Sequence, residues 1–160
     1  MRLTDRGLDS HLAGIANLLD RYGVSLDGGA LTVEEATAGA RTLDIRGFLP
    51  DGRRPSRAVL EIRETWLPAG PGVFERAEYV YELLDGERDF RRAFHLHDRD
   101  WFERHFLVVV HEHCERPIGT ERCAHYEGTP VRDAFAGVFV LVDAWTTDSP
   151  ECSSLRCLRT

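Results

Sequence analysis

The spacing of apolar residues changes about a quarter of the way along the chain. Between residues 8 and 22, apolar side chains recur every three or four positions, as on one face of an α-helix, and Gly23 follows as a stop signal. The pair Thr32 and Glu35 has the spacing of a capping box, which predicts a second short helix that ends near Gly39. The first part of the sequence is therefore predicted to be helical.

From Arg41 onward, apolar and polar residues alternate, which is typical of strands with one buried face. Asp85-Gly86 is a strong tight-turn pair between two such runs. The apolar run from Phe106 to Val110 predicts a central strand that is covered on both faces. The predicted strands are, in order, TLDIRGFL, RAVLEIRETW, FERAEYVYELLDG, ERDFRRAFHLHD and FLVVVHEH.

Helical spacing returns near the C-terminus, after the aperiodic segment CERPIGTERCAHYEG, which predicts a loop. Thr129 and Pro130 are helix start signals. The apolar side of this predicted helix carries Val131, Phe135, Val138, Phe139 and Val142. We therefore expect one α+β domain over residues 1–160, an antiparallel β-meander of about five strands with an N-terminal and a C-terminal helix packed on the sheet.

Composition narrows the function classes. The net charge of −7 gives no global basic field of the kind that announces a nucleic-acid-binding protein. The segment MRLTDRGLDS lacks the pattern of a secretory signal, and the longest apolar runs are far shorter than the roughly 20 residues that span a bilayer. We therefore expect a cytoplasmic protein without a membrane role. In such a reducing compartment, its four cysteines are expected to be free thiols or metal ligands rather than disulfides.

Histidines are concentrated between Asp89 and Glu115, where five of the seven lie. The pairs His95/His97 and His111/His113 are each spaced by two residues, so each pair projects from a single face of its predicted strand. If the two strands are neighbours and the pairs share a face, the histidines form a site. If the pairs point to opposite faces, they are ordinary polar surface residues.

Two kinds of chemistry fit this pattern. Imidazoles titrate near neutral pH, so two of them can act as general base and general acid on an RNA 2′-hydroxyl and its leaving oxygen, while an arginine binds the phosphate. The residues for this reaction are His111 and His113, with His95 or His97 assisting and Arg91 or Arg92 on the phosphate. Alternatively, the histidines and nearby cysteines supply the nitrogen and sulfur ligands that zinc prefers, from His111, His113, Cys114, Cys123 and His125.

A third class of function has no chemistry. A sheet flanked by helices, with an acidic surface, can be a regulatory or interaction module that uses exposed aromatic side chains as anchors. We expect Trp66, Tyr79 and Tyr81 to fill the core. Trp101 is the expected exception, because it lies in a polar segment beside the histidines.

The run YVYELLDGERDFRRAFHLHD, followed by the VVVHEHCE strand and a helix preceded by EGTPVRDAF, resembles the TumE-type toxin family. The resemblance covers roughly residues 57 to 145, and the family's histidine segment corresponds to His111 and His113. The sequence departs from the family pattern where Ala93, Phe94 and His95 replace an aromatic residue followed by Asp and Asn. The resemblance implies a small toxin that acts on RNA and pairs with an antitoxin.

Overall fold

The computed structural model describes residues 1–28, 33–35, 37–51, 54–97, 99–107, 109–119, 123–125, 131–149 and 156–157. Its fold is α+β, as predicted. The helices are α1 (Asp5–Arg21), α2 (Arg99–Phe106) and α3 (Ala134–Thr146), with a 3-10 turn η1 (Thr37–Gly39). The strands are β1 (Arg2–Thr4), β2 (Ser25–Leu26), β3 (Val33–Glu35), β4 (Arg41–Asp51), β5 (Arg54–Gly70), β6 (Val73–Asp85), β7 (Phe90–Leu96), β8 (His111–Glu115), β9 (Cys123–His125) and β10 (Arg156–Cys157).

Within the described residues, the antiparallel sheet is larger than the predicted meander of about five strands. Eight strands follow one another in the order β10-β9-β8-β7-β6-β5-β4-β2, and β1 and β3 pair from the side with β6 and β4. The central meander from β4 to β8 is what alternation predicts. The remaining strands have two to three residues each, too few for alternation to reveal them.

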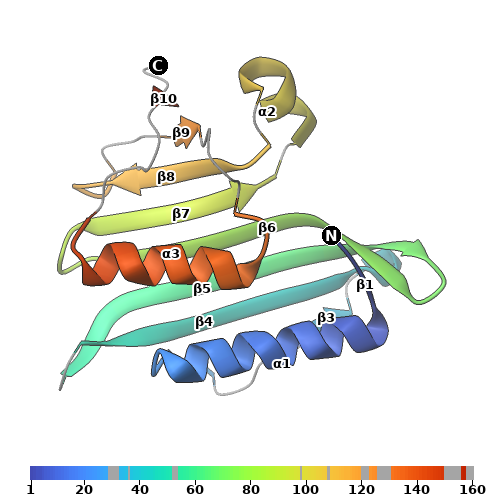
Figure 1. Ribbon diagram of the computed structural model, residues 1–160, viewed down its shortest axis with the longest axis horizontal. Helices are drawn as coiled ribbons and strands as arrows, with labels where there is room; N and C mark the ends of the chain where they lie inside the picture. The colour runs from blue at the N-terminus through green and yellow to red at the C-terminus, as the bar shows by residue number, and fades with distance from the viewer. Residues whose placement is uncertain are drawn as a thin grey trace.

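The main core lies between the sheet and the helices α1 and α3, which cover the same face (Figure 1). Thr4 caps α1 and Asp133 caps α3, each accepting a hydrogen bond from a backbone N–H three residues later. Gly137 lets α3 approach the sheet closely, because a Cβ atom there would lie 2.6 Å from Cδ2 of Tyr81. Both the predicted N-terminal and C-terminal helices are therefore confirmed as packing elements.

Three predicted elements are wrong in part. The second short helix is replaced by β3 and η1, while Thr32 lies outside the described residues. The strand predicted over FLVVVHEH begins only at His111, because α2 extends to Phe106 and Leu107 adopts a positive φ of 58°. The predicted loop after it contains strand β9.

The C-terminal helix buries a different set of side chains from the one its apolar residues predict. Val138 and Val142 face the core with Ala134, Leu141 and Trp145. In contrast, Phe135 is 38% exposed and Phe139 is 58% exposed. The predicted start at Thr129 and Pro130 lies outside the described residues.

A β-bulge interrupts β6. Thr65 of β5 lies opposite Glu78, but the next residue, Trp66, lies opposite Arg76, so Ala77 is an extra residue without a partner. Since the extra residue reverses the alternation, Arg76 points to the same helix-covered face as Tyr79. The extra residue thus places Arg76 on the helix-covered face, while Ala77 and Glu78 line a groove beside His97.

Over the described residues, none of the helices combines the length and the apolar character that crossing a bilayer demands.

Candidate functional site

The two histidine pairs lie on neighbouring strands and share one face of the sheet. His95 of β7 stands directly opposite His111 of β8, and the centroids of their rings are 5.2 Å apart. His113 stands opposite Ala93, and its ring lies 4.6 Å from that of His95. Because Phe90 and Phe94 alternate with these residues and pack in the helix-covered core, the histidines lie on the opposite, open face.

Three of the imidazoles converge. One ligand nitrogen from each of His95, His97 and His111 lies within 4.8 Å of the others. Two imidazole nitrogens on one tetrahedral zinc ion lie about 3.3 Å apart, given Zn–N bonds of about 2.0–2.1 Å. Modest rotations of the three side chains therefore suffice to place all three nitrogens on one ion.

Helix α2 closes one side of this cluster. Phe102 stacks on His111 with a ring separation of 4.2 Å and an interplanar angle of 13°, and it meets His97 edge-on at 5.7 Å. His111 is only 2% exposed, whereas His95 and His97 are half-buried. The cluster is thus sheltered on the His111 side and reachable from the His97 side.

Two described carboxylates, those of Glu82 and Glu115, flank the cluster. Nε2 of His95 lies 3.7 Å from Glu82, and Nδ1 of His113 lies 3.8 Å from Glu115. Arg91 holds both carboxylates, through Nε at 2.7 Å from Glu82 and Nη1 at 2.5 Å from Glu115. Burial raises the pKa of Glu82, but the interactions with His95 and Arg91 more than offset this effect. The pKa of Glu82 is therefore lowered to about 2.

The environment keeps His113 neutral. Burial, together with the nearby charges of His95 and Arg91, lowers the pKa of His113 to about 4. A neutral imidazole is the form that binds a metal ion or accepts a proton.

The structure separates some of the predicted site residues from this cluster. Arg92 lies on the helix-covered face, where its guanidinium forms a buried ion pair with Glu112 at 2.5 Å. It therefore does not share the histidine face, and Arg91 is the arginine that does. Arg91 and Arg92 are separated because adjacent strand residues point to opposite faces.

Two of the predicted metal ligands are cysteines, Cys114 and Cys123. Cys114 is disulfide-bonded in this structure, so the expectation of a free thiol or thiolate ligand at this position is wrong. Sequence spacing cannot reveal which sulfur atoms meet in space. The backbone of β9 places His125 opposite His111 and Cys123 opposite His113, while the side chains of β9 lie outside the described part of the molecule.

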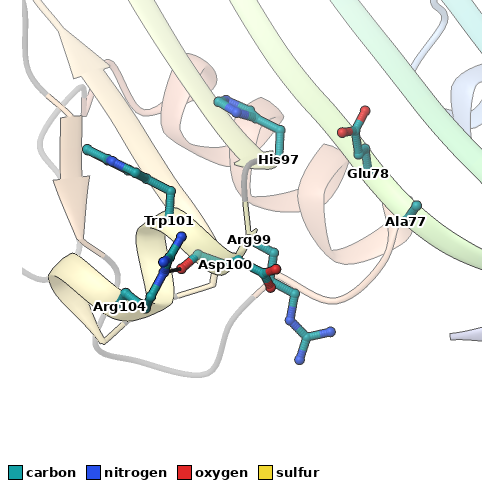
Figure 2. A pocket seen from close by; sticks show the side chains of 7 residues that line it. All are labelled: Ala77, Glu78, His97, Arg99, Asp100, Trp101 and Arg104. Atoms are coloured by element: carbon teal, nitrogen blue, oxygen red, sulfur yellow. Dashed lines mark hydrogen bonds between the residues drawn. The ribbon is translucent and has the colours of Figure 1, made fainter.

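An open groove of about 450 Å³ adjoins the cluster at His97 (Figure 2). Ala77 and Glu78 of the β6 bulge line one side, and residues of α2, including Trp101 and Arg104, line the other. Trp101 is 46% exposed, as predicted, whereas Trp66, Tyr79 and Tyr81 are buried.

A second polar cluster lies on the opposite, helix-covered face and escapes the sequence patterns above. The carboxylate of Glu64, only 2% exposed, accepts hydrogen bonds from His11 at 2.8 Å and from Trp66 at 3.1 Å through Oε2. Its Oε1 accepts from Tyr81 at 2.6 Å and from Arg76 at 3.0 Å. Burial raises the pKa of Glu64, but His11, Tyr81 and Arg76 outweigh it, so the pKa is lowered from its ordinary value.

Two signals in the sequence point to this second cluster. Glu64 falls between Ile62 and Trp66 in the phase of a buried strand face, and His11 falls between Leu8 and Ile15 on the apolar helix face. Polar residues at apolar positions indicate a buried network, because burying them without partners is unfavourable.

No protein-family model, no curated protein and no solved structure matches this chain. The resemblance to TumE-type toxins stays a prediction.

Proposed function

We propose that this protein binds a transition-metal ion, zinc above all, through His95, His97 and His111, and that the ion is a catalytic centre. One observation carries the proposal: the ligand nitrogens of these three residues lie within 4.8 Å of one another. Structural zinc sites have four protein ligands, whereas catalytic sites have three and keep a fourth position for water or substrate. Three histidines match the second kind.

Hydrolysis is the chemistry that such a centre supports best. A zinc ion lowers the pKa of bound water to about 7 and so supplies hydroxide as a nucleophile at neutral pH. Glu82 fits the role of an outer partner, because histidine ligands commonly donate their second ring N–H to a carboxylate. Nε2 of His95 lies 3.7 Å from Glu82, so a small rotation of the ring would bring the two groups within hydrogen-bond distance.

Metal content tests this proposal directly. Protein purified without a histidine tag, saturated with zinc and freed of excess metal by dialysis should retain about one zinc ion per chain. The variants His95→Ala, His97→Ala and His111→Ala should each lose most of it. His105→Ala is the matched control, since this exposed histidine hydrogen-bonds the backbone of its own helix and lies outside the trio. A wild-type content far below one per chain would overturn the proposal.

A second candidate is the metal-free ribonuclease of a toxin–antitoxin module, which the resemblance to TumE-type toxins implies. It is favoured by the 4.6 Å separation of the His95 and His113 rings beside Arg91, because acid–base catalysis needs two imidazoles within reach of one substrate. A phosphate would have to compete with Glu82 and Glu115 for Arg91. RNA cleavage and growth arrest that persist in chelator, but disappear in His113→Ala, would favour this candidate over zinc catalysis.

A further inference from the structure

The groove beside the histidine trio has the features of a ligand site. It is lined by His97, one of the three proposed metal ligands, so it adjoins the proposed metal site. Its volume of about 450 Å³ falls within the roughly 300–1,000 Å³ of small-molecule pockets. The bulge at Ala77 shapes its wall, and bulges are frequent beside active sites.

Trp101 gives the groove an aromatic surface. Trp101 is 46% exposed, and its indole stacks on His105 with a ring separation of 4.7 Å and an interplanar angle of 27°. This stacking fixes the orientation of the indole, and an indole held in place binds a planar ring at little entropic cost. The aromatic surface therefore selects a ligand with a flat ring.

The charge of the groove depends on the ion. Arg99 and Arg104 balance Glu78 and Asp100, so the lining without metal has no net charge. Three neutral imidazoles leave both charges of a zinc ion uncompensated, which makes the loaded site positive. Arg104 forms no ion pair with any described residue; its Nε donates to the backbone oxygen of Asp100 at 2.8 Å.

We infer that this groove binds a nucleotide, a planar base that stacks on Trp101 and carries a phosphate directed to Arg104 and the metal ion. Glu78 and Asp100 supply acceptors for the amino and hydroxyl groups of such a ligand. The inference rests on the proposed zinc site, because the ion provides the excess positive charge. The same chemistry is offered by a free mononucleotide and by the phosphorylated end of a single RNA strand.

Calorimetric titration of the zinc-loaded protein with AMP, adenosine and inorganic phosphate tests the inference. AMP should bind more tightly than either fragment. Trp101→Ala should weaken AMP and adenosine by roughly tenfold while leaving phosphate unchanged, as expected for the loss of one stacked base. Arg104→Gln should weaken AMP and phosphate by roughly tenfold while leaving adenosine unchanged. Arg21→Gln, an exposed arginine in the last turn of α1, is the matched control and should bind all three like the wild type.

Zinc content is measured on the same samples, so the two proposals fail separately. One zinc per chain with no AMP binding at millimolar concentration would overturn the nucleotide site and leave the metal site standing. AMP binding of equal strength with and without zinc would overturn the role given to the ion. A short RNA with a 5′-phosphate is titrated last. If it binds more tightly than AMP, the ligand of the groove is the end of an RNA strand; if it binds more weakly, the ligand is a free nucleotide.

Discussion

Two polar clusters occupy opposite faces of the same sheet, and their histidines have different partners: a carboxylate on one face and other imidazoles on the other. On the helix-covered face, His11 is one of four donors that saturate the buried carboxylate of Glu64. On the open face, four imidazoles gather with ring separations of 4.6 to 5.5 Å. Among the described residues, Glu82 lies 3.7 Å from His95 and Glu115 lies 3.8 Å from His113. A saturated network stabilises a fold, whereas converging imidazole nitrogens suit a cation.

The largest expected effect comes from breaking the saturated cluster. Glu64→Gln leaves the guanidinium of Arg76, 5% exposed, without an opposite charge, so the free energy of unfolding should fall by about 3–5 kcal/mol in urea denaturation. Zinc content should not change. The control is Glu75→Gln, whose partner Arg2 is 67% exposed, with an expected loss of at most about 1 kcal/mol. Equal losses in the two variants would contradict the structural role of this cluster.

The open cluster should instead respond to metal. Zinc at a hundred times its dissociation constant should stabilise the folded protein by about 2.7 kcal/mol, seen as a rise in Tm that a chelator reverses. The double variant His95→Ala/His111→Ala should show no zinc-dependent rise, because it lacks two ligands of the trio. Glu64→Gln should keep the rise on its lowered baseline. A zinc response retained in the histidine double variant would place the ion elsewhere.

The sequence predicts different parts of the two clusters, and the histidine cluster is the one it predicts better. Alternation along ERDFRRAFHLHD and along the predicted strand FLVVVHEH places each histidine pair on one strand face. The pairing of β7 with β8 confirms that His95, His111 and His113 share a face. The nitrogen of His97, and not that of His113, converges with those of His95 and His111. This depends on strand register and on side-chain torsion angles, which the spacing of apolar residues in the sequence does not predict. Phe102 reaches His111 only because α2 turns back over the strands, a tertiary contact that no local pattern indicates.

The bulge at Ala77 conceals the place of Arg76 in the Glu64 cluster from sequence patterns. Simple alternation through FERAEYVY places Arg76 and Tyr79 on opposite faces, whereas the extra residue brings them to the same one. The odd spacing between the buried aromatic residues Phe74 and Tyr79 is the available signal for this bulge. The same bulge places Ala77 and Glu78 at the groove. It therefore shapes the groove on one face of the sheet and the Glu64 cluster on the other.

Acid should weaken the protein through Glu64. Its pKa is lowered in the folded state, so the unfolded chain takes up the proton first as the pH falls. The stabilisation is therefore fully present above the unfolded pKa near 4.5 and is lost as the pH drops through the folded pKa. The loss amounts to about 1.4 kcal/mol for each pH unit that separates the folded pKa from the unfolded one. Unfolding free energies measured between pH 6 and 3 should fall more steeply for the wild type than for Glu64→Gln. Parallel curves would contradict this assignment.

The smallest expected effect is that of removing His113, the fourth imidazole, which is not one of the three proposed ligands. His113 lies near His95 and His111, but its Nδ1 faces Glu115 at 3.8 Å, and it does not belong to the set whose ligand atoms converge. His113→Ala should keep about one zinc per chain and weaken zinc binding by less than tenfold, or about 1.4 kcal/mol, when measured by competition with a chromophoric chelator. His97→Ala should weaken binding far more, since it removes a ligand. If the two variants exchange these results, His113 is the third ligand and His97 belongs to the groove alone.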